Sequence, residues 1–423
     1  MTAVRKKSGM NKPSISETGK AADPAPDGAS PGISVGRPPT VLQVVPELVT
    51  GGVERGTIDI AQALAAAGGR AFVASAGGPM ENTLKRAGVE HITLPVQSKN
   101  VFVLLRNVAR LQAIIEAHDI DVVHARSRAP AWSAYFAARR TGRPFVTTFH
   151  GTYGAQNALK RWYNRVMTKG ARTIAISKFI ADHVRNTYGL DPDRLVVIRR
   201  GVDLEVFDPK AVAPGRFIPM AQSWRLPDGI PVVMLPGRLT RWKGQQVFID
   251  AIARLGRKDI CAVMLGSDQG RLAYRDELED QIRDKDLGGV LRLVDETPDM
   301  PAALMLADVV VSASTDPEAF GRVIAEAGAM GRPVIATDHG GAREQVVEGE
   351  NGWLVPPGDP DALAQAIERA VTLDKAVRER MSAAASARVR EHFSRTAMCE
   401  ATLALYREVA AEAGRGTSNR AQS

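Results

Sequence analysis

The chain alternates short apolar runs, rich in β-branched residues, with longer stretches in which apolar residues recur every three or four positions. In the first half the short runs are TVLQVV (40–45), RAFVAS (70–75), DVVHA (121–125), PFVTTF (144–149) and RTIAIS (172–177). Short apolar runs separated by helical periodicity predict strands that pair in parallel through intervening helices. The first half therefore predicts one α/β sheet.

The same alternation begins again near residue 231. Its short runs are PVVMLPG (231–237), CAVMLG (261–266), LRLV (291–294), DVVVSAS (308–314) and PVIAT (333–337). Between the two series, DPKAVAPG and RLPDG give a composition that is typical of a linker. We expect an α/β fold of two doubly wound, Rossmann-like domains that face a cleft, with ligand loops beyond the carboxyl ends of the strands.

The length of 423 residues agrees with about two domains. The first 38 residues are rich in Ser, Pro, Gly and Lys and predict a disordered tail, as do the last ten. The predicted division of the chain is tail 1–38, N-terminal domain 39–205, linker 206–230, C-terminal domain 231–395, C-terminal helix 396–413 and tail 414–423.

Two absences bear on location. No run approaches the roughly 18 to 20 apolar residues that span a bilayer, and no apolar segment follows the positive charges at the N-terminus. Cys261 and Cys399 are the two cysteines, and neither has a C-x-x-C partner, which fits a reducing compartment. We therefore expect a cytoplasmic protein.

Positive charge is concentrated in one segment. The formal net charge is +8, and residues 122–181 contain eleven Lys or Arg and no Asp or Glu. This segment predicts a surface for an anionic partner, such as phospholipid headgroups or a phosphorylated acceptor, unless it is a chance cluster on a solvated face. Within it, ALKRWYNRVMTKGAR (158–172) combines Trp162 and Tyr163 with basic residues, as membrane-interface segments do. No nucleic-acid-binding module accompanies the charge, so we expect no nucleic-acid partner.

The loop PGRLTRWKGQ follows the first strand of the second series and contains Gly237, Arg238 and Lys243. Arg offers a planar fork for phosphate oxygens and Lys a mobile point charge, so the pair suits a diphosphate. The alternative is that both are ordinary surface residues.

The stretch SASTDPEAFGRVIAEAGAMGRPVIATDHGG (312–341) places two glutamates around a predicted helix start. The free N–H groups near Phe320 and Gly321 would attract an anion. Glu318, just outside that helix end, is placed to accept hydrogen bonds from sugar hydroxyls, and Glu326, inside the helix, to accept two from a ribose. Both glutamates could instead be surface residues of an ordinary helix end.

The spacing of Glu318 and Glu326 resembles the Glu, seven residues, Glu signature of retaining glycosyltransferases. Residues 40–412 resemble glycosyltransferase family 4, which has the GT-B fold. GRLTRWKG is similar to the diphosphate loop of that family, GRPVIATDHGGAREQV with Gly340 and Gly341 to its donor-sugar loop, and NGWLVPPGDPDALAQAI to its closing turn and helix.

The N-terminal half resembles the family more loosely. PELVTGGVERG is similar to the family's glycine loop, in which Gly51 and Gly52 would let the backbone approach the donor phosphate or the acceptor. TFHG places His150 where many relatives have a histidine near the reacting sugar, although a structural role is equally open. Arg322 stands where the family commonly has an aliphatic residue and would add positive charge near the phosphates.

The resemblance implies transfer of a sugar from a nucleotide diphosphate sugar, UDP- or GDP-linked, with retention of anomeric configuration and without a metal or another cofactor. The C-terminal domain would bind the donor and the N-terminal domain the acceptor. Arg238, Lys243 and the N–H groups near Gly321 would stabilise the departing diphosphate. The implied acceptor is a glycan or glycolipid of the cell surface, lipopolysaccharide or a lipid-linked polysaccharide, reached from the inner face of the cytoplasmic membrane.

Two other functions stay open. A sugar-nucleotide epimerase of the GT-B fold would use the same donor site, and a non-catalytic scaffold would keep the fold alone. The scaffold would be marked by loss of the Arg, Lys or Glu residues of the site, and all are present. The chain has no G-x-G-x-x-G and no G-x-x-x-x-G-K-[ST], which disfavours dehydrogenases and P-loop NTPases.

Overall fold

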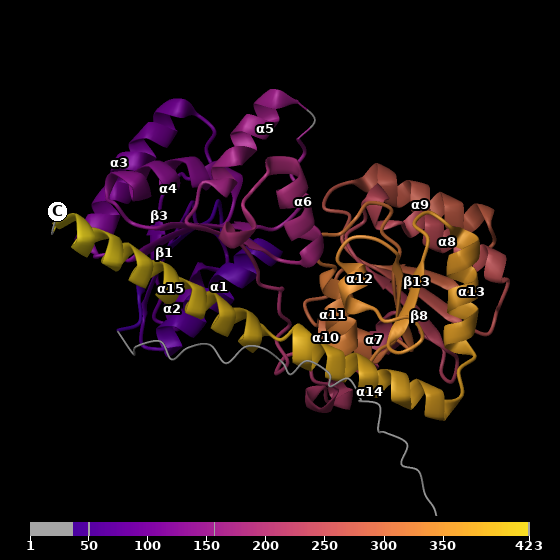
Figure 1. Ribbon diagram of the computed structural model, residues 1–423. Coiled ribbons are helices and arrows are strands. Elements are labelled where there is room, and N and C mark those ends of the chain that lie inside the picture. The colour runs from indigo at the N-terminus through magenta and orange to yellow at the C-terminus, as the bar shows by residue number, and fades with distance from the viewer. Residues whose placement is uncertain (1–36, 50, 156, 422–423) are drawn as a thin grey trace, which may run out of the picture. The chain divides into compact units, whose positions relative to one another are not determined.

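The computed structural model describes residues 37–49, 51–155 and 157–421 and contains two parallel β-sheets (Figure 1). We call the part that holds the first sheet the N-terminal lobe and the part that holds the second the C-terminal lobe. Almost all of the tail predicted for residues 1–38 lies outside the described residues.

The N-terminal lobe is a seven-stranded sheet in the order β3-β2-β1-β4-β5-β6-β7. Neighbouring strands pair in parallel throughout. The strands are β1 (Thr40–Val44), β2 (Arg70–Ser75), β3 (Glu90–Thr93), β4 (Val122–Ala125), β5 (Phe145–Phe149), β6 (Arg172–Ala175) and β7 (Leu195–Val197). The helices are α1 (Gly52–Ala66), α2 (Glu81–Arg86), α3 (Val101–Ala117), α4 (Arg128–Arg140), α5 (Ala158–Asn164) and α6 (Lys178–Tyr188), with 3-10 turns η1 (Arg165–Thr168) and η2 (Pro192–Arg194).

The C-terminal lobe is a six-stranded parallel sheet in the order β10-β9-β8-β11-β12-β13. Its strands are β8 (Val232–Pro236), β9 (Cys261–Leu265), β10 (Leu291–Val294), β11 (Val309–Ser312), β12 (Val334–Thr337) and β13 (Gly352–Val355). Its helices are α8 (Gln245–Leu255), α9 (Leu272–Asp284), α10 (Met300–Met305), α11 (Arg322–Ala329), α12 (Ala342–Gln345) and α13 (Pro360–Val371), with the turn η4 (Arg241–Lys243).

Both sheets are doubly wound, which confirms the predicted fold class. In each, the strand order reverses next to the first strand, between β1 and β4 and between β8 and β11. Their central strands are mostly apolar and are buried along their whole length because helices cover both faces. A ligand is expected at the carboxyl ends of the strands beside such a reversal, and most of the predicted site residues follow these strands.

The segment predicted as a linker, residues 206–230, contains the turn η3 (Pro209–Ala211) and the helix α7 (Pro214–Ser223). The helix packs on α10, and Phe217, Met220 and Trp224 lie partly buried against the core of the C-terminal lobe. Pro214 starts this helix, because a proline is tolerated in the first turn, where its missing N–H has no partner to lose. The linker composition thus concealed a packed element.

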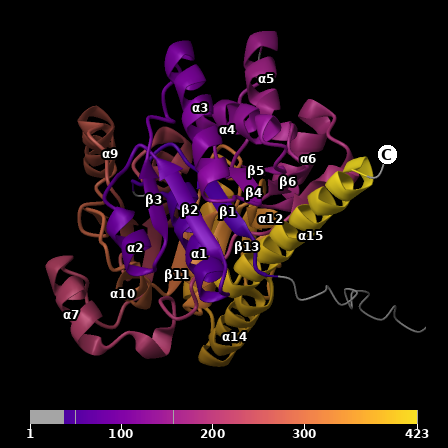
Figure 2. The ribbon, with the colours of Figure 1, turned by 90° about the vertical axis from the view of Figure 1, so that its left-hand side faces the viewer.

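The last two helices are α14 (Lys375–His392) and α15 (Arg395–Ala421). The first packs on α11 of the C-terminal lobe, whereas the second packs on α1, as Figure 2 shows. Met398, Leu403, Tyr406 and Val409 of α15 share one buried core cluster with strands of the N-terminal lobe. The C-terminal helix therefore continues past residue 413, where the sequence predicted its end, and completes the core of the N-terminal lobe.

Candidate functional site

The loop after β8 brings Lys243 to the end of β11. Gly244 starts α8 with a φ of 73°, in the left-handed region, and a Cβ there would lie 1.9 Å from the carbonyl oxygen of Ala313. The N–H of Thr315 donates to the carbonyl of Trp242 over 2.7 Å. Only glycine permits both this backbone conformation and this close approach. The diphosphate loop predicted from sequence therefore rests directly on the loop that holds Glu318.

Lys243 and Glu318 form an ion pair, with 2.7 Å between Nζ and Oε1. Their side chains are 14% and 16% exposed, so the pair is largely shielded from water. The same carboxylate oxygen accepts from the hydroxyl of Ser314 over 2.6 Å. Burial alone would raise the pKa of the Glu318 carboxyl, but the Lys243 ammonium and the hydroxyls of Ser314 and Ser312 outweigh it and hold this pKa below its ordinary value. Glu318 is therefore an ionised acceptor.

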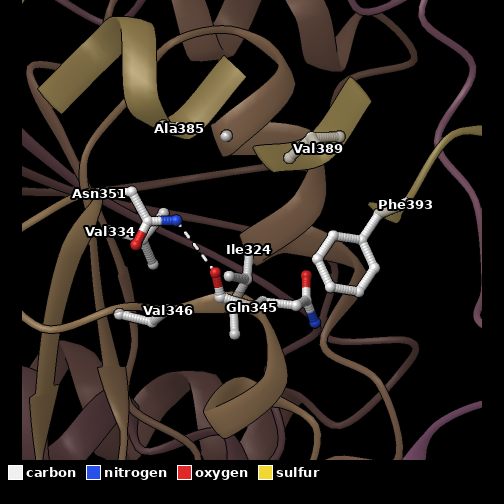
Figure 3. A pocket seen from close by; sticks show the side chains of 9 residues that line it. Ile324, Val334, Gln345, Val346, Asn351, Ala385, Val389 and Phe393 are labelled. Atoms are coloured by element: carbon white, nitrogen blue, oxygen red, sulfur yellow. Dashed lines mark hydrogen bonds between the residues drawn. The ribbon is translucent and has the colours of Figure 1, made fainter. Parts of the chain in front are cut away.

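The start of α11 is held in place by Gln345. The Nε2 of Gln345 donates to the carbonyl of Phe320, and Gly321 adopts a φ of 81° just before the helix begins. A small pocket lies beside this contact (Figure 3), and in it Asn351 donates to the carbonyl of Gln345 over 3.0 Å. The described residues that line the pocket include no titratable side chain. We therefore interpret the pocket as packing that supports the helix start.

Glu326 lies one turn inside α11 and is 5% exposed. Arg322 donates to its Oε1 from Nε over 3.1 Å and from Nη2 over 2.5 Å. Arg322, which the sequence predicted to lie near the phosphates, is thus paired with the Glu326 carboxylate in this structure. The contacts engage one of the two oxygens of Glu326, and its role toward a ribose stays a prediction.

The glycine pair Gly340 and Gly341 rests on the backbone of the Glu318 loop. The N–H of Gly341 donates to the carbonyl of Glu318 over 2.8 Å, and a Cβ at Gly340 would lie 2.4 Å from the same oxygen. The neighbouring His339 was not singled out by sequence analysis, and both of its buried ring nitrogens lack a partner among the described residues. A histidine directly before the glycine pair and after a strand was the available signal.

Arg238 is exposed, and its guanidinium makes no hydrogen bond or ion pair with a described residue. Its carbonyl accepts from Nε2 of Gln245 over 2.9 Å, which fixes the loop against the start of α8. A Cβ at Gly266 would lie 1.9 Å from the carbonyl of Gly237, so the loops after β8 and β9 cross closely. Arg238 is therefore a free cation on a well-fixed backbone.

In the N-terminal lobe, Gly51 and Gly52 form the start of α1, and His150 directly follows β5. Both ring nitrogens of His150 are buried and have no partner among the described residues. Burial, together with the charges of Arg126 and Arg200, holds the pKa of His150 well below its ordinary value. The imidazole is therefore neutral, so it can donate one hydrogen bond and accept another.

Two arginines at the carboxyl edge of the N-terminal sheet were missed as site residues. Arg126 follows β4 and is 3% exposed, and Arg200 comes three residues after β7. A Cβ at Gly52 would lie 2.8 Å from Nη1 of Arg200. Burial, with the charges of Arg322 and Arg126, lowers the pKa of Arg200 to about 9. Arg126 had been counted within the basic segment 122–181 as part of a surface, which is wrong for this residue because it lies at a buried sheet edge.

Three further observations concern an open groove, membrane-spanning helices and metal sites. An open groove lies between α7 and the loop after β10 and is lined by Met220, Trp224, Asp295 and Thr297 among others. No helix in the described ranges is both long and apolar enough to cross a bilayer. Within the same ranges, no group of three His, Cys, Asp or Glu side chains is placed to hold a metal ion.

Comparison with known proteins gives the following matches. The sequence profile of glycosyltransferase family 4 matches residues 50–206, and that of glycosyl transferases group 1 matches residues 219–388. The chain is 31% identical, over 306 residues, to a D-inositol 3-phosphate glycosyltransferase of Paenarthrobacter aurescens, an alignment that covers 68% of this chain and 72% of that protein.

Among solved structures, a glycosyltransferase from Rickettsia africae is 37% identical with a TM-score of 0.82, covering 88% of this chain and 98% of the other. HepE of Anabaena in complex with UDP is 25% identical with a TM-score of 0.76, covering 86% and 98%. Both neighbours agree with the GT-B arrangement that the sequence predicted.

Proposed function

The chain belongs to the family of glycosyl transferases group 1, with an N-terminal lobe of the glycosyltransferase family 4 type, and is an enzyme of glycosyl transfer; we propose that it moves a sugar from a nucleotide diphosphate sugar to an acceptor hydroxyl with retention of configuration and without a metal. The observation that carries the proposal is the shielded Lys243–Glu318 pair in the loop that leads to Gly321 and the start of α11.

The reaction requires the bond between the anomeric carbon and the diphosphate oxygen to break while the acceptor oxygen bonds to that carbon. Negative charge then grows on the leaving diphosphate. Lys243, the free cation Arg238 and the N–H groups near Gly321 would stabilise that charge, since preorganised cations and dipoles act strongly where water is excluded. The hydroxyl proton of the acceptor passes to the departing phosphate, which needs no separate base.

Glu318 and His150 would orient the sugar. The ionised Glu318 accepts hydrogen bonds from sugar hydroxyls, and Lys243, held by that carboxylate, stays in place for the phosphate. His150, neutral and without a partner among the described residues, can bond to a hydroxyl of the sugar or of the acceptor. A misplacement of the sugar by about 1 Å can cost about 100-fold in rate, which is why a fixed scaffold matters.

We favour UDP as the nucleotide of the donor, because HepE, at 25% identity, was crystallised with UDP and with UDP-glucose. The test is a thermal-shift series with UDP, GDP, ADP, dTDP and their sugars on the wild type and on Glu326→Ala. A ligand at about 100 times its Kd should stabilise the protein by about 2.7 kcal/mol. A shift for UDP that the variant reduces supports the proposal, and an equal shift in both proteins would contradict the ribose role.

Catalysis is tested separately with the donor so identified. Product formation with an acceptor, followed by the anomeric proton coupling in NMR, distinguishes retention from inversion. An isomerised donor without any acceptor product would instead identify an epimerase. Donor binding with neither product would identify a scaffold.

For the acceptor we propose a cell-surface glycan on a lipid, reached by docking on the cytoplasmic side of an anionic membrane. Helices α3 and α5 lie at the same end of the N-terminal lobe in both views (Figures 1 and 2). Phe102 on α3 and Leu159 and Trp162 on α5 are 75%, 74% and 59% exposed. Exposed apolar side chains among basic residues favour an anionic bilayer surface.

A small phosphorylated acceptor is the second candidate. It is favoured by the relatives named D-inositol 3-phosphate glycosyltransferases, one of which is 31% identical to this chain. Such an acceptor would need a phosphate site in the N-terminal lobe and would not need the membrane.

A further inference from the structure

One buried amide side chain connects the two loops that would surround the donor. Gln345 lies at the end of α12 and is 3% exposed (Figure 3). Its Nε2 donates to the carbonyl of Phe320 and lies 3.4 Å from the carbonyl oxygens of Gly321 and Gly341. The first two carbonyls belong to the residues directly before α11, and the third belongs to the glycine pair. A single amide group therefore fixes the two loops to each other.

The orientation of this amide is set by its surroundings. Three carbonyl oxygens surround Nε2, and a flipped amide would place Oε1 against all three of them. An amide oxygen accepts hydrogen bonds and cannot donate one, so the flipped arrangement would be repulsive. Nε2 is therefore the donor to the loops, and Oε1 is buried without a partner among the described residues.

Two side chains hold the backbone at Gln345. Its carbonyl accepts from Nδ2 of Asn351 over 3.0 Å and from Nε of Arg388 over 2.8 Å. Nη2 of Arg388 also donates to the carbonyl of Glu344 over 2.7 Å. A helix of four residues is too short to be stable alone, so these contacts fix α12 and, with it, the amide of Gln345.

Fixing the carbonyl of Phe320 also fixes the N–H group of Gly321. Both groups belong to one trans peptide unit, in which C=O and N–H point in opposite directions. The N–H of Gly321 therefore points away from Gln345, and it has no hydrogen-bond partner among the described residues. Glycine is conformationally free, and Gly321 has a φ of 81°, so this peptide unit needs an anchor to keep one orientation.

The stability of the fold does not explain a glutamine at this position. A buried oxygen without a partner lowers stability, and an apolar side chain of similar size would avoid that penalty. The pocket beside the amide is lined mainly by apolar residues, among them Ile324, Val389 and Phe393. An apolar side chain would thus suit these surroundings, but it would leave the peptide unit between Phe320 and Gly321 free to turn.

We propose that Gln345 is a positioning residue of the transfer reaction, which orients the N–H groups at the start of α11 toward the leaving group. It does not touch the substrate itself. The inference rests on the proposed function, in which these N–H groups stabilise the charge of the departing diphosphate. Preorganised dipoles act on charge that develops in the transition state, so loss of their orientation lowers kcat more than it weakens donor binding.

The first test measures the release of UDP from UDP-glucose, with water in place of the acceptor hydroxyl. Gln345→Met keeps an unbranched side chain but removes the donor, and it should lower kcat at least tenfold while KM stays within threefold. Gln281→Met is the matched control. Nε2 of Gln281 donates to the carbonyl of Gln246 over 3.3 Å, and its Oε1 is likewise buried without a partner among the described residues. This control should keep kcat within threefold of wild type.

Gln345→Glu tests the donated hydrogen bond itself. An ionised carboxylate cannot donate, whereas a protonated one donates a single hydrogen bond. Burial raises the pKa of the introduced carboxyl, and the nearby charges of Arg388 and Glu344 act on it in opposite directions. The ratio of its kcat to that of wild type should therefore rise as the pH falls from about 8 to about 6. The same ratio for Gln345→Met should stay constant.

Amide hydrogen exchange gives a readout that does not depend on the reaction. Without ligand, exchange of residues 318–326 should rise at least tenfold in Gln345→Met and should stay as in wild type in Gln281→Met. Unchanged exchange of the buried strand β12 shows that the variant is folded. A wild type that releases no UDP counts against the proposed function, and the exchange of residues 318–326 then decides the role of Gln345.

Three results would overturn the inference. The first is a kcat of Gln345→Met within twofold of wild type. The second is a kcat ratio of Gln345→Glu that does not change with pH. The third is unchanged exchange of residues 318–326 in Gln345→Met, which would show that the amide does not order the start of α11.

Discussion

The carboxyl edges of the two sheets differ in whether their cationic side chains are paired with carboxylates. In the C-terminal lobe, Lys243 is paired with Glu318 and Arg322 with Glu326. In the N-terminal lobe, Arg126 and Arg200 face the start of α1 with no carboxylate in ion-pair contact among the described residues. The same fold therefore carries one edge where Lys243 and Arg322 are paired with carboxylates, and one where two arginines have no such partner.

This difference indicates two kinds of binding. A paired cation such as Lys243 is oriented before the ligand arrives, which suits stabilisation of charge that develops during a reaction. An edge with excess positive charge gains most from a ligand that is already anionic when it binds. The first fits the departing diphosphate.

The largest expected effect is on Lys243. Lys243→Met should lower kcat by about 10²–10³-fold, the usual effect of losing one group that stabilises developing charge. It also leaves Glu318 without its cation. The rate of product formation at saturating donor measures this, with Lys375→Met, which is 90% exposed, as the control. A fall of less than tenfold would show that the paired lysine does not act on the leaving group.

The second effect concerns the exposed positive charge of the N-terminal lobe and its binding to anionic membranes. The triple charge reversal Lys160→Glu, Arg161→Glu and Arg165→Glu on and beside α5 should weaken binding to anionic vesicles by about 100-fold or more, at about 1 kcal/mol per basic residue near a bilayer. Vesicle co-sedimentation at low salt measures this binding, and unchanged sedimentation would reject this surface as the docking site.

The third effect concerns the neutral histidine. His150 has a folded-state pKa well below the ordinary value near 6.5, so below that pH the unfolded chain binds a proton that the folded chain does not. Folding stability should therefore fall as the pH drops below 6.5, by about 1.4 kcal/mol per pH unit for this group. His150→Gln should remove that share of the slope in urea denaturation between pH 6.5 and 5. An unchanged slope would show that the ring is protonated in the folded state.

The strands that the sequence predicted are the central ones. Ten apolar runs correspond to β1, β2, β4, β5, β6 and β8 to β12. The missed β3 (EHIT) and β7 (LVV) are short edge strands with partly exposed residues, so they carry little apolar signal. The missed β13 (GWLV) was hidden among Asn, Gly and Pro of its flanking turns.

The site residues of the two lobes also differed in how easily they could be predicted from the sequence. Glu318, Phe320, Gly321 and Glu326 are close in sequence, so their order alone indicated a shared site. Arg126 and Arg200 are 74 residues apart, and only the strand order β1-β4-β5-β6-β7 brings their loops to the start of α1. No local pattern marks such a pair, although a polar residue soon after a buried strand was a usable sign for each.

Because α15 is at the end of the chain, the N-terminal lobe cannot complete its core until almost the whole protein has been synthesised. Tyr406 of this helix contacts the buried His124 over 2.5 Å, across 282 residues of chain, and Met398, Leu403 and Val409 complete the same side of the N-terminal sheet. A ribosome adds about 5–20 residues per second, so the first lobe to emerge must wait for tens of seconds with an uncovered apolar face. We expect the nascent chain to depend on chaperones over that interval, even though each half has the sequence pattern of an independent domain.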